Sequence, residues 1–194
     1  MRLHVYKKGF RALGISESFV KGVSKESILA GVVMRADMKI DGFTFSRVTV
    51  GGTDATEKIL EMYKRLRRDD INLLLLNGCV ISWYNVIDLH RVAEETGLPL
   101  ICVTYNESAG LERYFRELFP EDWEQRVEIY RKNKGRVPVK LFTGHIVYIR
   151  YIGMKIEEAR EVLNRFTFEG AIPEPLRISR LLARSIVKSL DASM

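Results

Sequence analysis

Hydrophobic and polar residues alternate along the first fifty positions in the way that is typical of β-strands. Three such runs cover residues 11–16, 27–37 and 42–52. The Asp41-Gly42 pair between the second and third runs is a strong signal for a two-residue hairpin turn. The opening of the chain is therefore predicted to be an antiparallel meander of three strands.

The third run has apolar residues at every second position, with one slip near Arg47. They are Phe43, Phe45, Val48 and Val50. A period of two places such side chains on one face of a strand, so we expect this face to lie in the core.

After residue 52 the period changes to that of a helix. Residues 53–68 carry an apolar stripe and end in basic residues, which suits the helix dipole. Two unbroken apolar runs follow at 71–77 and 98–105, and between them a helix is predicted over 84–96, ending at Gly97. Unbroken apolar runs that alternate with helices are typical of parallel strands covered on both faces.

The last part of the chain holds a charged helical insertion over 108–132, which Pro120 splits into two halves. The elements predicted after it are a loop (132–138), a strand (140–153), a helix (155–166) and a final helix entered through Pro173 and Pro175. No repeat or low-complexity segment interrupts the pattern, so we expect one domain over residues 1–194.

Composition places the chain among ordinary globular proteins, with 46% hydrophobic and 29% charged residues. No apolar run approaches the roughly 20 residues that cross a bilayer. The N-terminus has no apolar signal region, so we expect a cytoplasmic protein without a membrane partner. The two cysteines, Cys79 and Cys102, do not make a disulfide framework and are expected in the core.

The net charge of +6 allows nucleic acid or another anionic partner without requiring one. The basic residues are spread along the chain, which is also typical of solvated helix faces and ion pairs. Sequence motifs for phosphate cradles, dinucleotide binding, zinc proteases and serine hydrolases are absent. The three histidines, His4, His90 and His145, lack the spacing of metal ligands.

The predicted elements define an α/β fold in which an antiparallel meander is followed by parallel strands in one mixed sheet, with helices on both faces. Their order is that of the RNase H-like fold, in which the ends of the first and fourth strands lie side by side. Two-metal phosphodiester hydrolysis needs carboxylates at this edge, because Mg²⁺ prefers hard oxygen ligands. The residues found there are Ser16 and Asn77, and neither carries a charge.

Five segments carry a resemblance to the endonuclease V superfamily, and more closely to its archaeal relatives of unknown function (domain of unknown function 99). In chain order they are "ALGISES" (12–18), "VTVGGTDATEKILEMYKRL" (48–66), "LLLLNGCVISWYNVIDLHRVAEETGLPLICVT" (73–104), "YIGMKIEEAREVL" (151–163) and "GAIPEPLRISRLLA" (170–183). Each segment alone is loosely specific, but the order and spacing together cover nearly the whole chain.

The resemblance implies where the catalytic groups of the superfamily would fall. The first-strand aspartate becomes Ser16, the glutamate that opens the helix falls near Asp54, the Asp-Gly aspartate becomes Asn77, and the Gly-His histidine becomes Met154. The archaeal relatives typically have Gly-Ile-Asp-Asp and Asp-Gly at these places, so this chain departs even from them. Glu17 is a poor substitute for the first aspartate, because successive strand side chains point to opposite faces.

With at most one acid, Asp54, we expect weak Mg²⁺ or Mn²⁺ binding or none, and two-metal catalysis is expected to fail. The first hypothesis is therefore a nuclease-derived protein that binds DNA or RNA through the inherited cleft. Its expected contacts are Arg11, Trp83, Tyr84 and Asn85, because "SWYN" follows the Asn-Gly turn and aromatic rings can stack on bases. Helix packing is the alternative role of Trp83 and Tyr84.

Two other hypotheses stay open. One is an enzyme with altered chemistry that uses Asp54 and a single metal ion, and the other is a protein-interaction scaffold whose contact surface is the 108–136 region. Asn77 could also serve only its Asn-Gly turn, and Asp54 could be only a first-turn helix acid. The sequence leaves enzymatic activity and oligomeric state undecided.

Overall fold

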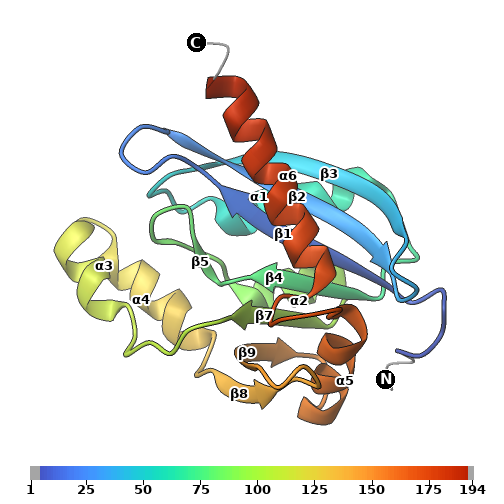
Figure 1. Cartoon of the computed structure of the whole chain (residues 1–194). Coiled ribbons are helices and arrows are strands. Elements are labelled where there is room, and N and C mark those ends of the chain that lie inside the picture. The colour runs from blue at the N-terminus through green and yellow to red at the C-terminus, as the bar shows by residue number, and fades with distance from the viewer. Residues whose placement is uncertain (1–4, 192–194) are drawn as a thin grey trace.

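A seven-stranded mixed sheet forms the centre of the computed structural model, which describes residues 5–191 (Figure 1). The strand order is β3-β2-β1-β4-β7-β9-β8. The strands are β1 (Arg11–Ser18), β2 (Glu26–Arg35), β3 (Ile40–Thr49), β4 (Leu73–Asn77), β7 (Leu100–Thr104), β8 (Val137–Lys140) and β9 (Ile146–Ile152). A separate two-stranded ribbon pairs β5 (Val80–Ile81) with β6 (Asn85–Val86).

Three strands in the middle of the sheet, β1, β4 and β7, run parallel to one another, and the remaining neighbours pair antiparallel. Leu73 to Leu76 are buried on both faces of β4, as the unbroken apolar run predicts. The meander followed by parallel strands is therefore confirmed. The sheet then continues beyond β7 into the antiparallel β8–β9 hairpin.

Within residues 5–191, six helices surround the sheet: α1 (Ala55–Leu66), α2 (Leu89–Thr96), α3 (Glu112–Leu118), α4 (Trp123–Lys132), α5 (Ile156–Phe166) and α6 (Glu174–Asp191). Side chains of α1 and α2 pack with one face of β1 and β4, and those of α5 and the first turn of α6 pack with the other. Figure 1 shows α6 crossing β1 and β2, while α3 and α4 lie beyond the ends of β4 and β7.

The hairpin turn between β2 and β3 lies at residues 36–39, so the prediction of a turn at Asp41-Gly42 was wrong. Met38 takes the left-handed conformation there (φ 64°), and Asp41 lies inside β3. The predicted burial of Phe43 and Phe45 was also wrong, since they are 48% and 37% exposed.

The physical reason is the direction of the opposite side chains on β3. Thr44 and Val48 are buried, and the Thr44 hydroxyl donates to the carbonyl of Met62 in α1. Side chains one residue away must point to the other face, where β3 is the outermost strand of the sheet. Val48 is thus the member of the predicted apolar set that the core contains.

The helix predicted over 84–96 begins later than expected. The β5–β6 ribbon occupies its first part, and α2 begins after Asp88, whose carboxylate accepts from the Arg91 backbone N–H. Its end at Gly97, in the left-handed conformation (φ 67°), is as predicted. The run 140–153 likewise contains a turn at 141–145 that separates β8 from β9.

Candidate functional site

Ser16 and Asn77 lie side by side at the ends of neighbouring parallel strands. Ile15 of β1 is in register with Leu76 of β4, so the next residue on each strand points to the same face of the sheet. That face is the one covered by α6. The strand order thus brings together the two positions that the sequence placed at the expected site.

The Ser16 hydroxyl is enclosed by α6 rather than open to a cleft. It is 3% exposed, donates to the Leu176 carbonyl at 3.0 Å and accepts from the Ser179 hydroxyl at 2.8 Å. The Asn77 side chain is half-buried and makes no hydrogen bond with any residue in 5–191. Of the pair, Asn77 is the one that a ligand could reach.

Asp54 lies apart from this pair, at the start of α1 on the opposite face. Its carboxylate accepts from the Thr49 backbone N–H at 3.2 Å, from the Thr49 hydroxyl at 2.9 Å and from the Asn85 side-chain amide at 2.8 Å. These bonds join the end of β3 to the β5–β6 ribbon. No hydrogen bond links Asp54 to Ser16 or Asn77 within the described chain.

The residues at this edge do not fit a pair of divalent metal ions. A two-metal site needs several carboxylates around the ions. Here Ser16 donates to a backbone carbonyl, Asn77 is neutral, and the Asp54 carboxylate accepts hydrogen bonds from Thr49 and Asn85. Among residues 5–191, no three His, Cys, Asp or Glu side chains lie close enough together to hold a metal ion. His4 lies outside the described residues.

Two predicted site residues lie at the wrong edge of the sheet. Arg11 begins β1, whereas Ser16 lies near its end, and the Arg11 guanidinium forms ion pairs with Asp41 and Asp70 at 2.5 and 3.3 Å. Met154 follows Ile152, the partner of Leu100 at the start of β7, so it too lies at the edge where the parallel strands begin. The structure brings neither together with Asn77.

Asn85 is not available to a ligand, because it is fully buried. Its amide oxygen accepts from the Ala55 backbone N–H at 3.1 Å, and its amide nitrogen donates to the Thr49 carbonyl at 3.0 Å. Together with its bond to Asp54, these contacts use the side chain to hold the start of α1 against the ribbon. The prediction that Asn85 contacts nucleic acid was therefore wrong.

Trp83 and Tyr84 lie in the turn of the β5–β6 ribbon, not in a helix. Ser82, Trp83 and Tyr84, which we call the 82–84 turn, all have positive φ (46°, 59° and 67°). Such a backbone is unfavourable for residues with a Cβ, so the surroundings must impose it. The helix predicted to begin here is therefore absent, but the Tyr84 ring does pack against Phe115 of α3.

Glu17 supplies one of the restraints on the 82–84 turn. Its carboxylate accepts from the backbone N–H and the hydroxyl of Ser82, each at 3.2 Å, and from the Ser27 hydroxyl at 2.5 Å. Because Glu17 follows Ser16 on β1, it points away from α6, as strand geometry requires. The Glu17 carboxylate therefore holds the 82–84 turn against the end of β1.

Arg126 supplies another restraint on the 82–84 turn, and its role could hardly be predicted from the sequence. This α4 residue is 3% exposed and donates to the carbonyls of Gly51, Gly52 and Tyr84 at 2.7, 3.0 and 2.8 Å. It also forms an ion pair with Asp122 at 2.7 Å. The i, i+4 spacing of Asp122 and Arg126 predicts their ion pair. It does not predict that Arg126 also donates to backbone carbonyls of distant loops.

An aromatic cluster extends from the turn to α3. The ring of Tyr84 is stacked on that of Tyr114 (centroids 6.0 Å apart) and meets Phe115 and Phe119 edge-on at 5.9 Å each. Tyr114 is 46% exposed, so part of the cluster is open to solvent. The Lys21 ammonium lies 4.3 Å from the centre of the Trp83 ring and adds a positive charge beside it.

α6 presents a row of basic side chains on one face, because residues three or four apart align along a helix. Arg177 is paired with Glu174. Arg180, Arg184 and Lys188, here called the α6 stripe, form no hydrogen bond or ion pair with any of residues 5–191. The four-residue spacing of Arg180, Arg184 and Lys188 is visible in the sequence, but these residues were not among the predicted nucleic-acid contacts.

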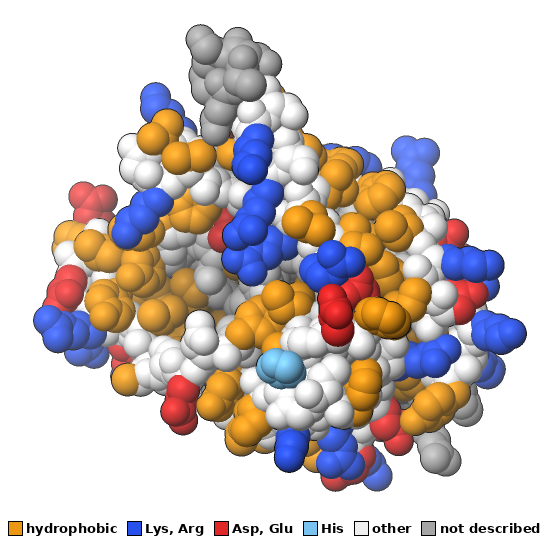
Figure 2. Space-filling model, in the orientation of Figure 1, with side chains coloured by type: hydrophobic (Ala, Val, Ile, Leu, Met, Phe, Trp, Pro, Cys, Tyr) orange, Lys and Arg blue, Asp and Glu red, His pale blue; other side chains and the backbone are white. Residues whose placement is uncertain are grey.

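A hollow separates the α6 stripe from the aromatic cluster. Figure 2 shows a column of Lys and Arg side chains over α6 and hydrophobic side chains over α3 and α4, with the recess between them. Tyr105, directly after β7, lies close to Arg180, whose charge opposes the rise that burial causes in the pKa of Tyr105. Val20 packs against Ala183 and Val187 of α6, and the next residue, Lys21, reaches the Trp83 ring.

The described part of the chain contains no helix that is both long and apolar enough to cross a membrane. A family model described as endonuclease dU matches residues 8–187. A UPF0215 protein of Pyrobaculum calidifontis is 35% identical over 180 residues, covering 92% of this chain and 98% of the relative.

Solved structures give the same picture of the fold. A protein of unknown function from Archaeoglobus fulgidus superposes with a TM-score of 0.79 at 28% identity, over 92% of this chain and 98% of that one. Endonuclease V from Ciona intestinalis, in complex with a DNA containing an inosine, gives a TM-score of 0.64 at 12% identity, over 93% and 87%. The fold is therefore RNase H-like and similar to that of endonuclease V.

Proposed function

The chain belongs to the endonuclease dU family, and from this membership and the geometry of the hollow we propose that it binds nucleic acid between the α6 stripe and the 82–84 turn. The observation that carries the proposal is the α6 stripe, whose three cations have no partner among residues 5–191. Unpaired cations along one line are what a phosphate backbone neutralises.

The aromatic side of the hollow supports an unstacked or single-stranded nucleic acid. Trp83, with Lys21 over its ring, and the partly exposed Tyr114 offer rings on which a base can stack. The neighbouring endonuclease V was solved with an inosine-containing DNA, and the name of the family specifies dU. A strand with a modified or deaminated base is therefore the class of ligand that we propose.

We further propose that this chain has given up two-metal catalysis while keeping the binding surface. The support is the chemistry of the strand ends: Ser16 holds α6 through Leu176 and Ser179, and Asn77 is neutral. An enzyme centred on Asp54 is less well supported, because that carboxylate is bonded to Thr49 and Asn85.

The test is fluorescence anisotropy with labelled single- and double-stranded DNA and RNA, with and without inosine or deoxyuridine, across a salt series. We expect binding that weakens steeply with salt. The Arg180→Ala/Arg184→Ala double variant should weaken binding to every sequence and lower the salt slope by about two, because each lost phosphate contact removes about one.

Lys58→Ala/Lys64→Ala is the matched control, because it removes two charges from α1 on the opposite face of the sheet and should bind normally. Trp83→Ala should weaken single-strand binding by about 1–3 kcal/mol without changing the salt slope, since stacking is not electrostatic. Absence of binding at low salt, or equal losses in both double variants, would overturn the proposal.

A further inference from the structure

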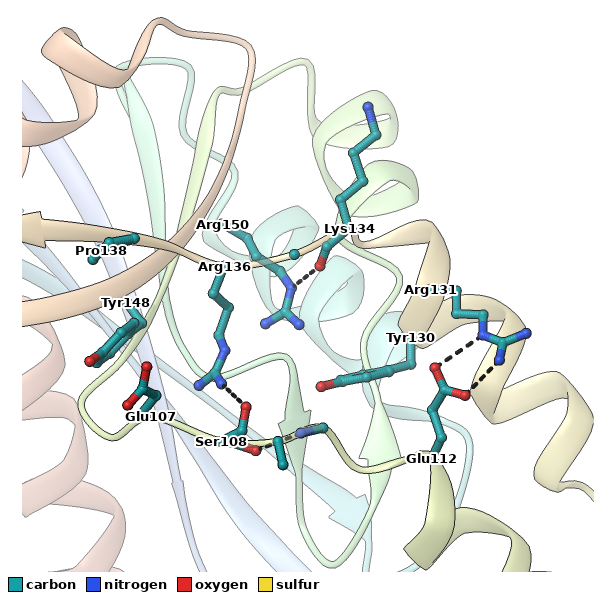
Figure 3. A pocket seen from close by; sticks show the side chains of 13 residues that line it. Glu107, Ser108, Glu112, Tyr130, Arg131, Lys134, Arg136, Pro138, Tyr148 and Arg150 are labelled. Carbon is teal, nitrogen blue, oxygen red and sulfur yellow. Dashed lines mark hydrogen bonds and ion pairs between the residues drawn. The ribbon is translucent and has the colours of Figure 1, made fainter.

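A second recess lies on the other side of the sheet from the α6 stripe. It has a volume of about 530 Å³ and is formed by the 107–110 loop, the end of α4 and the β8–β9 hairpin (Figure 3). Arg150 of β9 is in register with Cys102 of β7, whose side chain packs on the α1–α2 face. The recess therefore opens on the face opposite to Ser16 and Asn77, and neither of them lines it.

Arg150 is the main feature of this recess. It is only 6% exposed, and its Nε donates to the Lys134 carbonyl at 2.8 Å. The Tyr130 ring lies 5.3 Å from the guanidinium carbon. No acidic side chain among residues 5–191 forms an ion pair with Arg150, and its two terminal nitrogens point into the recess between Arg136 and Tyr130 (Figure 3).

A buried guanidinium without a counter-charge is costly, because it has left water without gaining an anion. The positive charge of Arg150 also acts on groups inside the protein. The pKa of the buried Cys79 thiol is lowered to about 7, first by a hydrogen bond with the Cys102 thiol and further by the charges of Arg150 and Arg136. A bound anion would accept hydrogen bonds from the two terminal nitrogens of Arg150 and neutralise its charge.

The rest of the wall fits a phosphate joined to a ring. Arg136 adds a second charge, and it fixes the loop by donating to the carbonyls of Asn106 and Ser108 at 3.0 Å each. Tyr130 and Tyr148 supply aromatic faces on two sides. Two acids line the recess: Glu112 is paired with Arg131 at 2.6 Å, and Glu107 lies at its Tyr148 end (Figure 3).

We propose that this recess binds a nucleoside monophosphate, with Arg150 on the phosphate and the base between the tyrosines. Its volume lies within the range of about 300–1,000 Å³ that is usual for small-molecule sites. A phosphate monoester suits the site better than a neutral nucleoside, because the buried charge needs an anion.

The test is isothermal titration calorimetry of the full chain with AMP, UMP, inorganic phosphate and adenosine. We expect both nucleotides to bind, phosphate to bind more weakly and adenosine not to bind. Arg150→Met should weaken nucleotide binding by at least about tenfold, and Arg150→Lys should restore it only in part, because an ammonium cannot make the paired bonds. Arg47→Met, on the far edge strand, is the charge-matched control.

The site is distinguished from the hollow by crossing the variants. Arg180→Ala/Arg184→Ala should leave nucleotide affinity unchanged, while Arg150→Met should leave oligonucleotide binding unchanged. If Arg150→Met does not fold, amide chemical shifts of the intact chain give the answer, since AMP should shift Ser108, Gly110 and Arg150. No nucleotide binding at millimolar concentration, or its loss in the α6 double variant alone, would overturn the proposal.

Discussion

The hydroxyl of Ser16 donates a hydrogen bond to the carbonyl of Leu176, 3.0 Å away and 160 residues later in the chain. This bond fastens α6 to the end of β1 at the position where the resemblance to endonuclease V implies a catalytic aspartate. The same contact therefore both encloses the Ser16 hydroxyl and positions α6, with its stripe, beside the hollow.

Ser16→Asp should destabilise the protein rather than restore a metal site. A carboxylate cannot donate to the Leu176 carbonyl, so two acceptors would face each other in a buried position. We expect a loss of about 2 kcal/mol or more in the free energy of unfolding, against about 1 kcal/mol for Ser16→Ala. Urea denaturation measures both.

Asn77→Asp is the control for that substitution, because Asn77 lies beside Ser16 on the same face but is half-buried and without a hydrogen-bond partner in residues 5–191. It should cost little. A Ser16→Asp variant as stable as the parent that also gains affinity for Mn²⁺ would contradict the closed arrangement.

Gly14→Ala should push α6 away from the sheet. A Cβ at Gly14 would lie 2.4 Å from the Cβ of Pro175 and 2.6 Å from its backbone carbonyl carbon, which leaves no room without movement. We expect a loss of about 1–3 kcal/mol in stability, as for an overpacked core, and weaker nucleic-acid binding. Gly135→Ala should do neither, since nothing lies within 4 Å of its added Cβ.

Arg126→Met should loosen the 82–84 turn. The substitution leaves the carbonyls of Gly51, Gly52 and Tyr84 without their donor, so we expect a loss of about 3 kcal/mol in unfolding free energy and a changed near-ultraviolet circular dichroism from Trp83. Arg113→Met removes an exposed i, i+4 pair with Glu117 and should cost no more than about 0.5 kcal/mol. Equal effects of the two changes would refute a special role for Arg126.

Acid should weaken the edge of the sheet where the parallel strands begin. The pKa of Asp41 is lowered chiefly by its hydrogen bond from Arg11 and then by Arg68, and that of Asp70 chiefly by Arg68. The unfolded chain therefore takes up these protons at a higher pH than the folded chain. The stability that the pairs contribute is present above the ordinary pKa of 3.8 and is lost as the pH falls below it.

Asp41→Asn/Asp70→Asn should accordingly lose less stability than the parent between pH 7 and pH 3, measured by urea denaturation at each pH. Asp69→Asn, at the exposed position next to Asp70, should retain the acid sensitivity of the parent. An unchanged pH dependence in the double variant would show that other carboxyls control the acid response.

The sequence by itself determined the class of fold and the neighbourhood of Ser16 and Asn77. Strand and helix periods are local properties, so the meander, α1 and the buried strands could be read directly from them. Once β1 and β4 are parallel neighbours, the ends of both strands must meet at one edge. The i, i+4 spacing of the α6 stripe was also legible in the sequence.

Only the tertiary structure decided what each site residue does. Arg11 lies at the far edge because it begins β1. Met154 lies there because it follows β9, which runs antiparallel to β7, and no local sequence signal predicts the direction of β9. Ser16 bonds α6, Asp54 bonds Asn85 as well as the nearby Thr49, and Arg126 bonds three loop carbonyls as well as the nearby Asp122. The distant partners lie outside any short sequence window, so the sequence did not predict them. Contacts of this kind exist only once the sheet and its helices have closed around them, and they decide which polar groups are used in holding the fold and which remain free for a ligand.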